Sequence, residues 1–365
     1  MPSFLPVFPC KRSLTPGSMK LIDFIKRNHY LAGIILILGV VSVGWLIWFA
    51  GATKYQSEVD RWIAVGRSEG YEISFDKREQ FGFPKHTVLR FSNVRWKNTN
   101  GITFKAGDLD ISAELWQTRN FLAKFKDQVE IDVPLEDGSL LILAGQGGSA
   151  NVTLADDGTW QTSAIDMRAA SVGRTPDYLF MAQVINLSAS RPAQTPKSSK
   201  EAGLTLSVYA EDLALPPAMS RTFGPKISQL AIDLRLMGAV PDFRKKESVM
   251  EWNRGFGVVD FDKFDLNWGP LLMTSKGTMG FDDDLEPEGA FAAQIAHTDE
   301  VLAALAKEGY IAESQSGMLS SSMKIFAKPV KVHNEDGVEV PVAVQLGGFF
   351  LGPVKIFSFP PIGWE

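Results

Sequence analysis

The spacing of apolar residues near the N-terminus predicts a helix that spans a membrane. Residues 30–50 read YLAGIILILGVVSVGWLIWFA, a run of 21 residues without a charged side chain. At about 1.5 Å per residue, a helix of this length spans roughly 30 Å, the thickness of the hydrocarbon core of a bilayer. Tyr30, Trp45 and Trp48 lie near its ends, where aromatic rings favour the membrane interface. We therefore expect a transmembrane helix over residues 30–52.

The following segment keeps a helical spacing before the period of the apolar positions changes. Val59, Trp62 and Ile63 recur on one face and Gly70 is typical of a helix end, so we expect an amphipathic helix that leaves the bilayer. Beyond it the period becomes two, in short runs bounded by Gly, Asn, Asp and Pro, which predicts strands. The predicted strand runs are YEISFD, TVLRFSNVRW, DLDISAELW, DQVEIDV, GSLLILA, ANVTLADDGTW, LTLSVYAED, ISQLAIDLRLM, VVDFDKFDLNW, LLMTSKGTMGFD, GAFAAQIA, SSSMKIFA and VEVPVAVQL.

Short turn sequences between these runs favour antiparallel hairpins over parallel crossovers. The turn dipeptides are Asn100-Gly101, Asp137-Gly138, Asp157-Gly158 and Asp336-Gly337. Two further helices are expected, a short one over residues 215–223 and one over residues 298–309, which begins with an acidic turn and ends at Gly309.

Several runs are apolar on one side only. From residue 338 to residue 346, Val and Leu alternate with Glu, Pro, Ala and Gln, and Pro341 indicates an edge strand because proline has no backbone donor. A dozen or more such strands need more cover than a few helices provide. We therefore predict a mainly β fold of antiparallel meander or hairpin sheets that form an open sandwich or a curled half-barrel, with one transmembrane helix and two or three short helices. An open sheet would leave an apolar groove that accepts an acyl chain.

The same pattern divides the chain into five parts. The polar stretch RPAQTPKSSKEAG is the clearest candidate for a linker between two lobes. The expected parts are a basic cytoplasmic tail at residues 1–29, the transmembrane helix at 30–52, a first β-rich lobe with its leading helix at 53–190, the linker at 191–203 and a second β-rich lobe at 204–365.

The distribution of charge predicts the orientation of the protein in the membrane. Residues 1–52 carry five basic side chains and one acidic side chain, whereas the remaining 313 residues carry 32 basic and 41 acidic ones. Basic residues are retained on the cytoplasmic side, so we place the N-terminus in the cytoplasm and the β-rich bulk across the membrane. The net charge of −5 leaves no basic excess of the kind that nucleic acid binding requires, so no nucleic acid partner is expected.

The N-terminal segment leaves two alternatives open. Ala50-Gly51-Ala52 has the form of a signal-peptidase site, although the apolar run is longer than a signal peptide needs, which favours a retained anchor. Met19 is an alternative start to Met1, because the stretch before it is rich in proline and has no periodicity. Cys10, the one cysteine, lies in that stretch, so disulfides, thiol catalysis and cysteine metal sites are excluded from the exported part.

Two glycine motifs match known sites but occur in the wrong context. Residues 66–70 (GRSEG) fit the pattern of a nucleophilic Ser68, but a helix precedes them and a β run follows, the reverse of a nucleophile elbow. Residues 145–150 (GQGGSA) resemble a dinucleotide-binding loop, but the next residues alternate like a strand rather than a helix. A glycine-rich hairpin is therefore expected there.

The polar clusters are also better explained by structure than by chemistry. His297 is the one histidine beside a carboxylate at a helix start, and helix capping and the helix dipole explain Asp299. Residues 282–286 (DDDLE) lack the spaced ligands of a calcium loop and predict a solvated turn. Asn151 and Asn186 begin glycosylation sequons inside predicted strands and are discounted. We predict no catalytic, cofactor-binding or metal-binding residues, no cofactor and no enzyme activity.

The order of several short motifs resembles a bacterial family, domain of unknown function 2125. The motifs are Trp62, Gly70-Tyr71, Gly82-Phe83-Pro84, Asn267-Trp268-Gly269-Pro270, Gly277, Gly289 before VLAALAKEGYI, and the ending GGFFLGPVKIFSFPPI. The resemblance implies an N-terminal membrane segment, an exported β-rich body and no established enzyme activity. More distantly, a single anchor followed by repeated hairpins is similar to envelope proteins of the AsmA type, which implies an apolar β groove that carries lipid.

Three functions follow as hypotheses. The leading one is a protein of the inner membrane of a two-membrane bacterium, which is held by one helix and binds lipid or another envelope component in its periplasmic β body. The second is a non-catalytic scaffold that presents a surface or an edge strand to another envelope protein. The third is a hydrolase whose catalytic residues are too far apart in sequence to recognise.

Overall fold

The computed structural model describes residues 29–362 except 115, 116, 136, 175, 176, 218 and 244. The predicted basic tail, Cys10 and the alternative start Met19 lie outside the described residues. The elements in chain order are α2 (His29–Ser68), β1 (Glu72–Ser74), β2 (Lys77–Phe81), β3 (His86–Lys97), β4 (Thr103–Glu114), β5 (Gln117–Pro134), β6 (Leu140–Leu154), β7 (Trp160–Arg174), β8 (Asp177–Ser190), β9 (Ala202–Ala214), β10 (Lys226–Met237), α3 (Lys246–Arg254), β11 (Val259–Trp268), β12 (Leu271–Phe281), β13 (Pro287–Ala296), α4 (Thr298–Lys307), α5 (Glu313–Phe326), β14 (Lys328–Val332), β15 (Glu335–Gln345), β16 (Gly348–Leu351) and β17 (Val354–Ser358).

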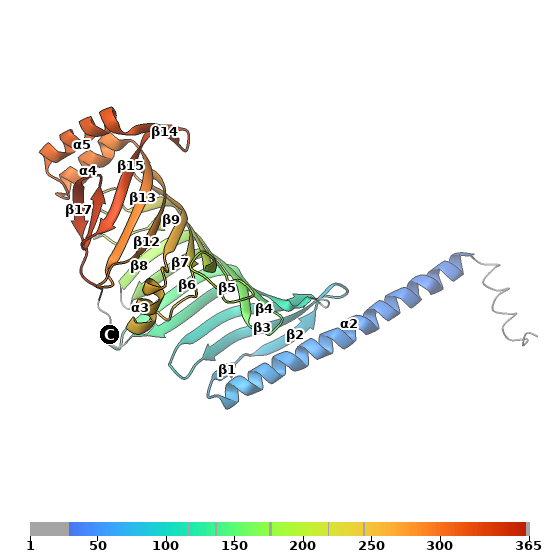
Figure 1. Cartoon of the computed structure of the whole chain (residues 1–365). Coiled ribbons are helices and arrows are strands. Elements are labelled where there is room, and N and C mark those ends of the chain that lie inside the picture. Colours follow the sequence, from blue (N-terminus) through green and yellow to red (C-terminus); the bar gives the residue numbers. More distant parts are fainter. Residues whose placement is uncertain are drawn as a thin grey trace, which may run out of the picture.

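The predicted transmembrane helix and the amphipathic helix after it form one continuous helix, α2, which extends beyond one end of the sheet (Figure 1). Its apolar side chains from Ile34 to Phe49 are mostly exposed, whereas Ala52 and Ile63 are buried against the sheet. The helix ends at Ser68, and Gly70, the predicted stop, lies in the turn that follows, with a φ of +89° that suits a residue without a Cβ.

The strands form one antiparallel meander. From β3 to β13 each strand pairs with the next strand along the chain. At one end, β1 and β2 share the outer side of β3. At the other end, β13 pairs with β15, and β14 and β16 share the outer side of β15, with β17 beyond β16. Short loops between neighbouring strands make this arrangement the simplest one for the chain.

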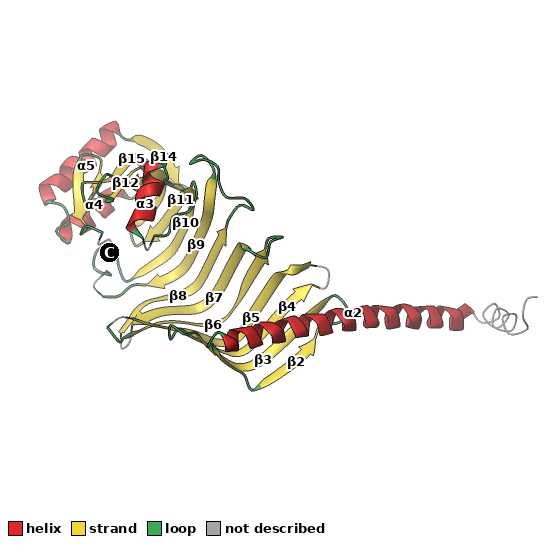
Figure 2. Ribbon diagram, turned by 60° about the horizontal axis from the view of Figure 1, so that its bottom comes forward, coloured by secondary structure: helices red, strands yellow, loops and turns green. Residues whose placement is uncertain are grey.

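The predicted fold class is confirmed. The described strands belong to a single open sheet, which is twisted and curved along its length, so the structure corresponds to the curled half-barrel rather than to two packed sheets (Figure 2). The polar stretch 191–203 connects β8 to β9, and these two strands pair directly. The division into two lobes at this stretch stays a prediction.

Backbone irregularities lie at the same level in the neighbouring strands β3 to β7. The division into an apolar and a polar face is preserved across them. The backbone has positive φ at Asn93, Gly147 and Ala169, and the pairings of β4 with β5 and of β5 with β6 shift register close by. A bulge adds a residue to a strand and bends it. Because each neighbouring strand is interrupted at the same level, paired side chains still project from the same face of the sheet on both sides of the interruption.

Two local predictions were wrong. The described residues of the stretch 215–223 lie in turns and a loop instead of a helix, since Leu215 is followed by two prolines and the stretch joins paired strands β9 and β10. The run SSSMKIFA, predicted as a strand, lies mostly in α5, because Leu319 and Met323 pack as one helical face on the end of the sheet.

Helix α3 was not predicted at all. Its Trp252 is buried, and the indole Nε1 donates a hydrogen bond to the carbonyl of Met237 at 2.8 Å.

Two predictions about β15 also need correction. Pro341 does not mark an edge strand, because β13 lies on one side of β15 and β14 and β16 lie on the other. Proline is tolerated since its backbone faces the gap between β14 and β16, where the Gly352 amide donates to the Pro341 carbonyl at 2.9 Å. Asp336-Gly337 lies within β15, and the turn before it is made by His333 and Asn334, both with positive φ. The other three turn dipeptides lie in turns as predicted.

One face of the sheet is polar, and its paired residues interact across the strands. Residues that are directly paired project on the same face, so the pairings trace rows. The central row of this polar face is Arg90, Asp110, Lys124, Ser149, Asp166, Asn186, Tyr209, Ala231, Asp265, Thr274, Gln294 and Glu339. Arg90 binds Asp110 with two hydrogen bonds of 2.6 and 2.7 Å, and Lys126 lies 3.3 Å from the same carboxylate.

We predict that the pair Arg90 and Asp110 stabilises the fold only above acid pH. The hydrogen bonds from Arg90 lower the pKa of Asp110 more than its partial burial raises it. A carboxylate whose pKa is lowered in the folded state stabilises the protein fully at pH values above the ordinary Asp pKa of about 3.9. This contribution is lost as the pH falls through the lowered pKa. At pH 7, Asp110→Asn should lower the unfolding free energy by about 1 to 3 kcal/mol in urea titrations, and below about pH 3 the difference should shrink.

The matched control for this variant is Asp336→Asn. The Asp336 side chain is 93% exposed and forms an ion pair with Lys331. This control should leave the urea midpoint nearly unchanged at either pH. An effect of Asp110→Asn that is equal at pH 7 and in acid would contradict the assignment of its stability to the ion pair.

The largest described core lies at the C-terminal end of the sheet. Helices α4 and α5 cover β12, β13 and β15 to β17, and Leu302 of α4 is 1% exposed at its centre. We predict that Leu302→Ala leaves a cavity that costs about 2 to 5 kcal/mol and speeds hydrogen exchange of the α4 and α5 amides. The same change at Leu346, which is 82% exposed, should have little effect on exchange. Equal exchange rates in the two variants would exclude this packing.

Candidate functional site

The face of the sheet opposite the polar rows is predominantly apolar, with Ser163 and Ser275 as its polar members in the rows given below. We call it the apolar face and define it by three rows of directly paired residues. The first row is Leu89, Ile111, Ala123, Ala150, Ile165, Leu187, Val208, Ile232, Phe264, Ser275, Ala293 and Val340. The second is Phe91, Leu109, Phe125, Gly148, Met167, Ile185, Ala210, Leu230, Leu266, Met273, Ile295 and Val338. The third is Ala113, Phe121, Val152, Ser163, Ala189, Leu206, Leu234, Phe261, Gly277, Phe291 and Val342.

In the described chain, the helical core clusters on the three rows lie at the two ends of the apolar face. At the N-terminal end, Val59 and Ile63 of α2 pack on Leu89, Phe91 and their neighbours in β1, β3, β4 and β5. At the other end, α4 and α5 pack on the same three rows, over β12, β13 and β15. Because the rows are continuous, both helical covers lie on one face of the sheet.

Between these covers, strands β6 to β10 have no described core cluster on the apolar face. In the three rows the large apolar side chains here are partly or largely exposed, with Ile165 at 37% and Leu187 at 40%. The end of β10 is an exception, since Leu236 is 5% exposed and Trp252 of α3 lies against the neighbouring Met237. Ala170, Ala182 and Ala210 are buried, because small side chains are shielded by larger neighbours on adjacent strands. Apart from this end of β10, the middle of the sheet therefore presents a broad apolar surface on which no described core cluster packs.

The glycine motif at residues 145–150 belongs to this surface. It lies inside β6 and makes no hairpin, so the prediction of a hairpin was wrong, although the strand after it is confirmed. Gly145 and Gly148 have no room for a side chain, since a Cβ would lie 2.5 Å from the Met167 side chain and 2.3 Å from the Asp166 carbonyl respectively. Glycine here lets the bulged strand β6 approach β7 while the alternation of the rows continues.

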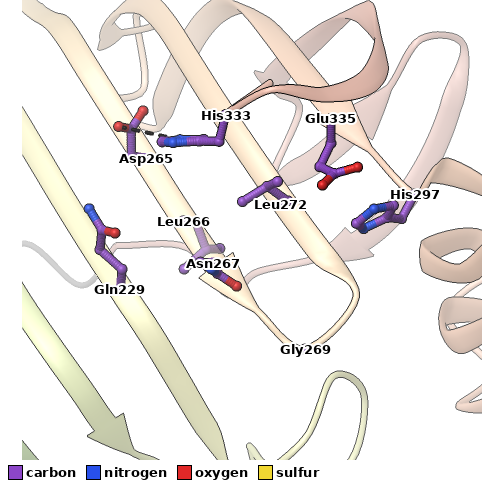
Figure 3. Close-up of a pocket in the computed structure, with 9 residues that line it drawn as sticks. All are labelled: Gln229, Asp265, Leu266, Asn267, Gly269, Leu272, His297, His333 and Glu335. Atoms are coloured by element: carbon purple, nitrogen blue, oxygen red, sulfur yellow. Dashed lines mark ion pairs between the residues drawn. The ribbon is translucent and has the colours of Figure 1, made fainter. Parts of the chain in front are cut away.

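A hollow of about 310 Å³ lies on the opposite, polar face near the C-terminal end (Figure 3). The residues that line it are Gln229, Asp265, Leu266, Asn267, Gly269, Leu272, His297, His333 and Glu335. His333 points towards Asp265, whereas His297 lies near Glu335 on the other side of Leu272. Because these groups are separated, no three His, Cys, Asp or Glu side chains of the described chain could hold a metal ion together.

The buried carboxylate of the hollow has protein partners. Asp265 is 5% exposed and accepts a hydrogen bond from the Thr274 hydroxyl. Lys263 Nζ lies 3.0 Å from its Oδ2, and His333 Nε2 lies 3.8 Å from the same atom. These contacts stabilise the carboxylate without a ligand. The sequence could not reveal them, because Asp265 and His333 are brought together only by the sheet register.

The other sequence motifs do not converge on a site. The Ser68 hydroxyl donates to the Val65 carbonyl at 2.7 Å at the end of α2, as the helix-end interpretation requires. His297 is at the start of α4, at the opposite end of the sheet (Figure 1). His297 occupies the cap position of this helix, and Asp299 lies in its first turn, where the helix dipole favours an acidic residue as predicted. Asp299 also accepts a hydrogen bond from the Ser320 hydroxyl at 2.6 Å.

The acidic stretch and the sequons have the structural roles that the sequence predicted. Asp282 accepts hydrogen bonds from the amides of Asp284 and Glu286, which forms a turn between β12 and β13. Asn151 and Asn186 lie in strands β6 and β8. Asn151 lines a second polar hollow, of about 240 Å³, among serine and threonine side chains of β6 to β9.

Helix α2 is the one helix of the described chain that is long and apolar enough to cross a membrane, and its candidate span is not buried by the protein. A membrane anchor at the N-terminus is therefore consistent with the structure. The span continues directly into the segment that covers the apolar face, without an intervening loop.

Comparison with known proteins gives one match. No curated protein and no solved structure matches this chain. The model of a family described as an uncharacterized protein conserved in bacteria, DUF2125, matches residues 48–360, from the last part of the apolar segment to just beyond β17. This confirms the family resemblance seen in the sequence, and the chain belongs to the DUF2125 family.

Proposed function

We propose that this protein is anchored in the inner membrane of a two-membrane bacterium and binds the acyl chains of lipids on its apolar face. In this proposal the N-terminus is cytoplasmic, α2 crosses the membrane once and the sheet lies in the periplasm. Binding is non-covalent, and no enzyme activity is involved. The distant similarity to lipid carriers of the AsmA type belongs to this proposal as an analogy of architecture.

The observation that carries the proposal is the uncovered middle of the apolar face. Soluble proteins rarely expose a contiguous apolar surface of this kind unless it meets a partner or a membrane. The strands β6 to β10 are about 4.8 Å apart, so the uncovered part is roughly 19 Å wide, and each strand provides several apolar side chains along its length. One leaflet contributes about 15 Å of the hydrocarbon core. The surface is thus large enough for an acyl chain, whose burial gains about 0.8 kcal/mol per methylene.

The attachment of the sheet favours lipid over a protein as the occupant. The apolar span of α2 leads directly into Ala52 and Ile63, which are buried on the sheet. A membrane that holds the span would therefore lie next to the start of the apolar face, and lipid is the apolar partner most abundant there. The excess of basic residues before the span supports the cytoplasmic N-terminus.

We predict that the full-length protein, extracted in detergent, carries lipid and that Leu187→Asp removes it. Leu187 lies in the first apolar row and is exposed, so the charge should leave the fold intact while it opposes contact with acyl chains. We expect the lipid-bound fraction in native mass spectra to fall at least about tenfold, which corresponds to about 1.4 kcal/mol.

The matched control is Ser188→Asp, one residue further along β8 and on the polar face, which should keep its lipid. Circular dichroism checks that both variants are folded. Wild-type protein without lipid, or loss of lipid to the same extent in both variants, would refute the proposal. A protein that co-purifies in place of lipid would instead favour the scaffold hypothesis.

A further inference from the structure

The first hairpin of the sheet is held alongside α2 at three levels. At the level farthest from the apolar span, Arg78 of β2 forms an ion pair with Asp60. Next, Gln80 Nε2 donates to the Ala52 carbonyl at 2.8 Å. These contacts fix β2 in position along the helix, so the turn that follows β2 must lie beside an earlier part of α2.

That turn reaches back onto the apolar span itself. The indole Nε1 of Trp48 donates to the His86 carbonyl at 2.9 Å. The Phe83 ring meets the Trp48 ring edge to face, with 5.8 Å between the centroids. Trp48 lies four residues before Ala52, which is about 6 Å further along the helix axis towards the N-terminus.

The side chains at this level have the character of a membrane interface. Phe83 is 42% exposed, and Trp45 and Phe49 of α2 are exposed nearby on the helix. Lys85 in the turn is also exposed, and the exposed Lys54 lies six residues beyond Trp48 on α2, on the side away from the apolar span. Aromatic rings favour the boundary between acyl chains and headgroups, and lysines near it extend towards the lipid phosphates.

We propose that the turn at residues 82–85 inserts into the headgroup boundary of the same bilayer that holds α2, as a second membrane contact. The inference rests on the proposed membrane anchor and adds to it a fixed orientation. With α2 and this turn both in the membrane, the first edge of the sheet is held at the bilayer surface and the sheet cannot swing freely about the helix. The partner is a phospholipid interface.

Site-specific probes in the full-length protein test this contact. Cys10→Ser removes the one native cysteine, and Leu38→Cys, Phe83→Cys and Asn100→Cys are then labelled singly with the fluorophore NBD. Each protein is placed in nanodiscs of phosphatidylethanolamine and phosphatidylglycerol, with or without a lipid that carries a doxyl quencher. Leu38 reports on the anchor, and Asn100 is exposed in the turn between β3 and β4, at the other end of the 12-residue strand β3.

We expect the doxyl lipid to quench the probes at residues 38 and 83 and aqueous iodide to quench the probe at residue 100. A probe at residue 83 that behaves like the one at residue 100, while residue 38 is embedded, overturns the second contact and leaves the anchor standing. A probe at residue 38 that is quenched only by iodide overturns both. Because Phe83→Cys also removes the contact with Trp48, Lys85→Cys repeats the measurement with Phe83 in place and must give the same result.

Discussion

The structure depends on one constraint, the period of two in an antiparallel sheet whose register is kept across more than a dozen strands. A slip of one residue in any pairing would move apolar side chains to the polar face from that strand onwards. The bulges near Asn93, Gly147 and Ala169 are tolerated because the neighbouring strands are interrupted at the same level. The two faces therefore keep their character from α2 to the C-terminal helices.

This constraint has opposite consequences on the two faces. On the polar face, paired charges and hydroxyls such as Arg90 with Asp110 and Thr274 with Asp265 satisfy one another in water-exposed surroundings. On the apolar face the hydrophobic effect favours cover, and the helical core clusters of the described chain provide it at the two ends. The uncovered strands between them are the part of the molecule whose stability would change most with an apolar ligand, because a ligand that binds the native state stabilises it.

The junction of α2 with the sheet links this surface to the proposed membrane. The helix runs without a break from its exposed apolar part to residues that are buried against β3 and β4. Contacts from Gln80 and His86 to the same helix hold the first hairpin in place. A flexible linker would let the sheet take any orientation, whereas this junction makes the orientation of the apolar face a property of the fold.

The sequence by itself determined the apolar span, the period of most strands, the turns at Asn100-Gly101, Asp137-Gly138 and Asp157-Gly158, and the family, because each depends on local patterns. It also predicted that the apolar faces of the strands would exceed the helical cover. It could not place Pro341, α3 or α5, since their conformations depend on what packs against them. Only the tertiary structure decided that one sheet is formed, that both helical covers lie on the same face and that Phe83 meets Trp48. These contacts join residues far apart in the chain, and only the sum of all the strand registers brings them together.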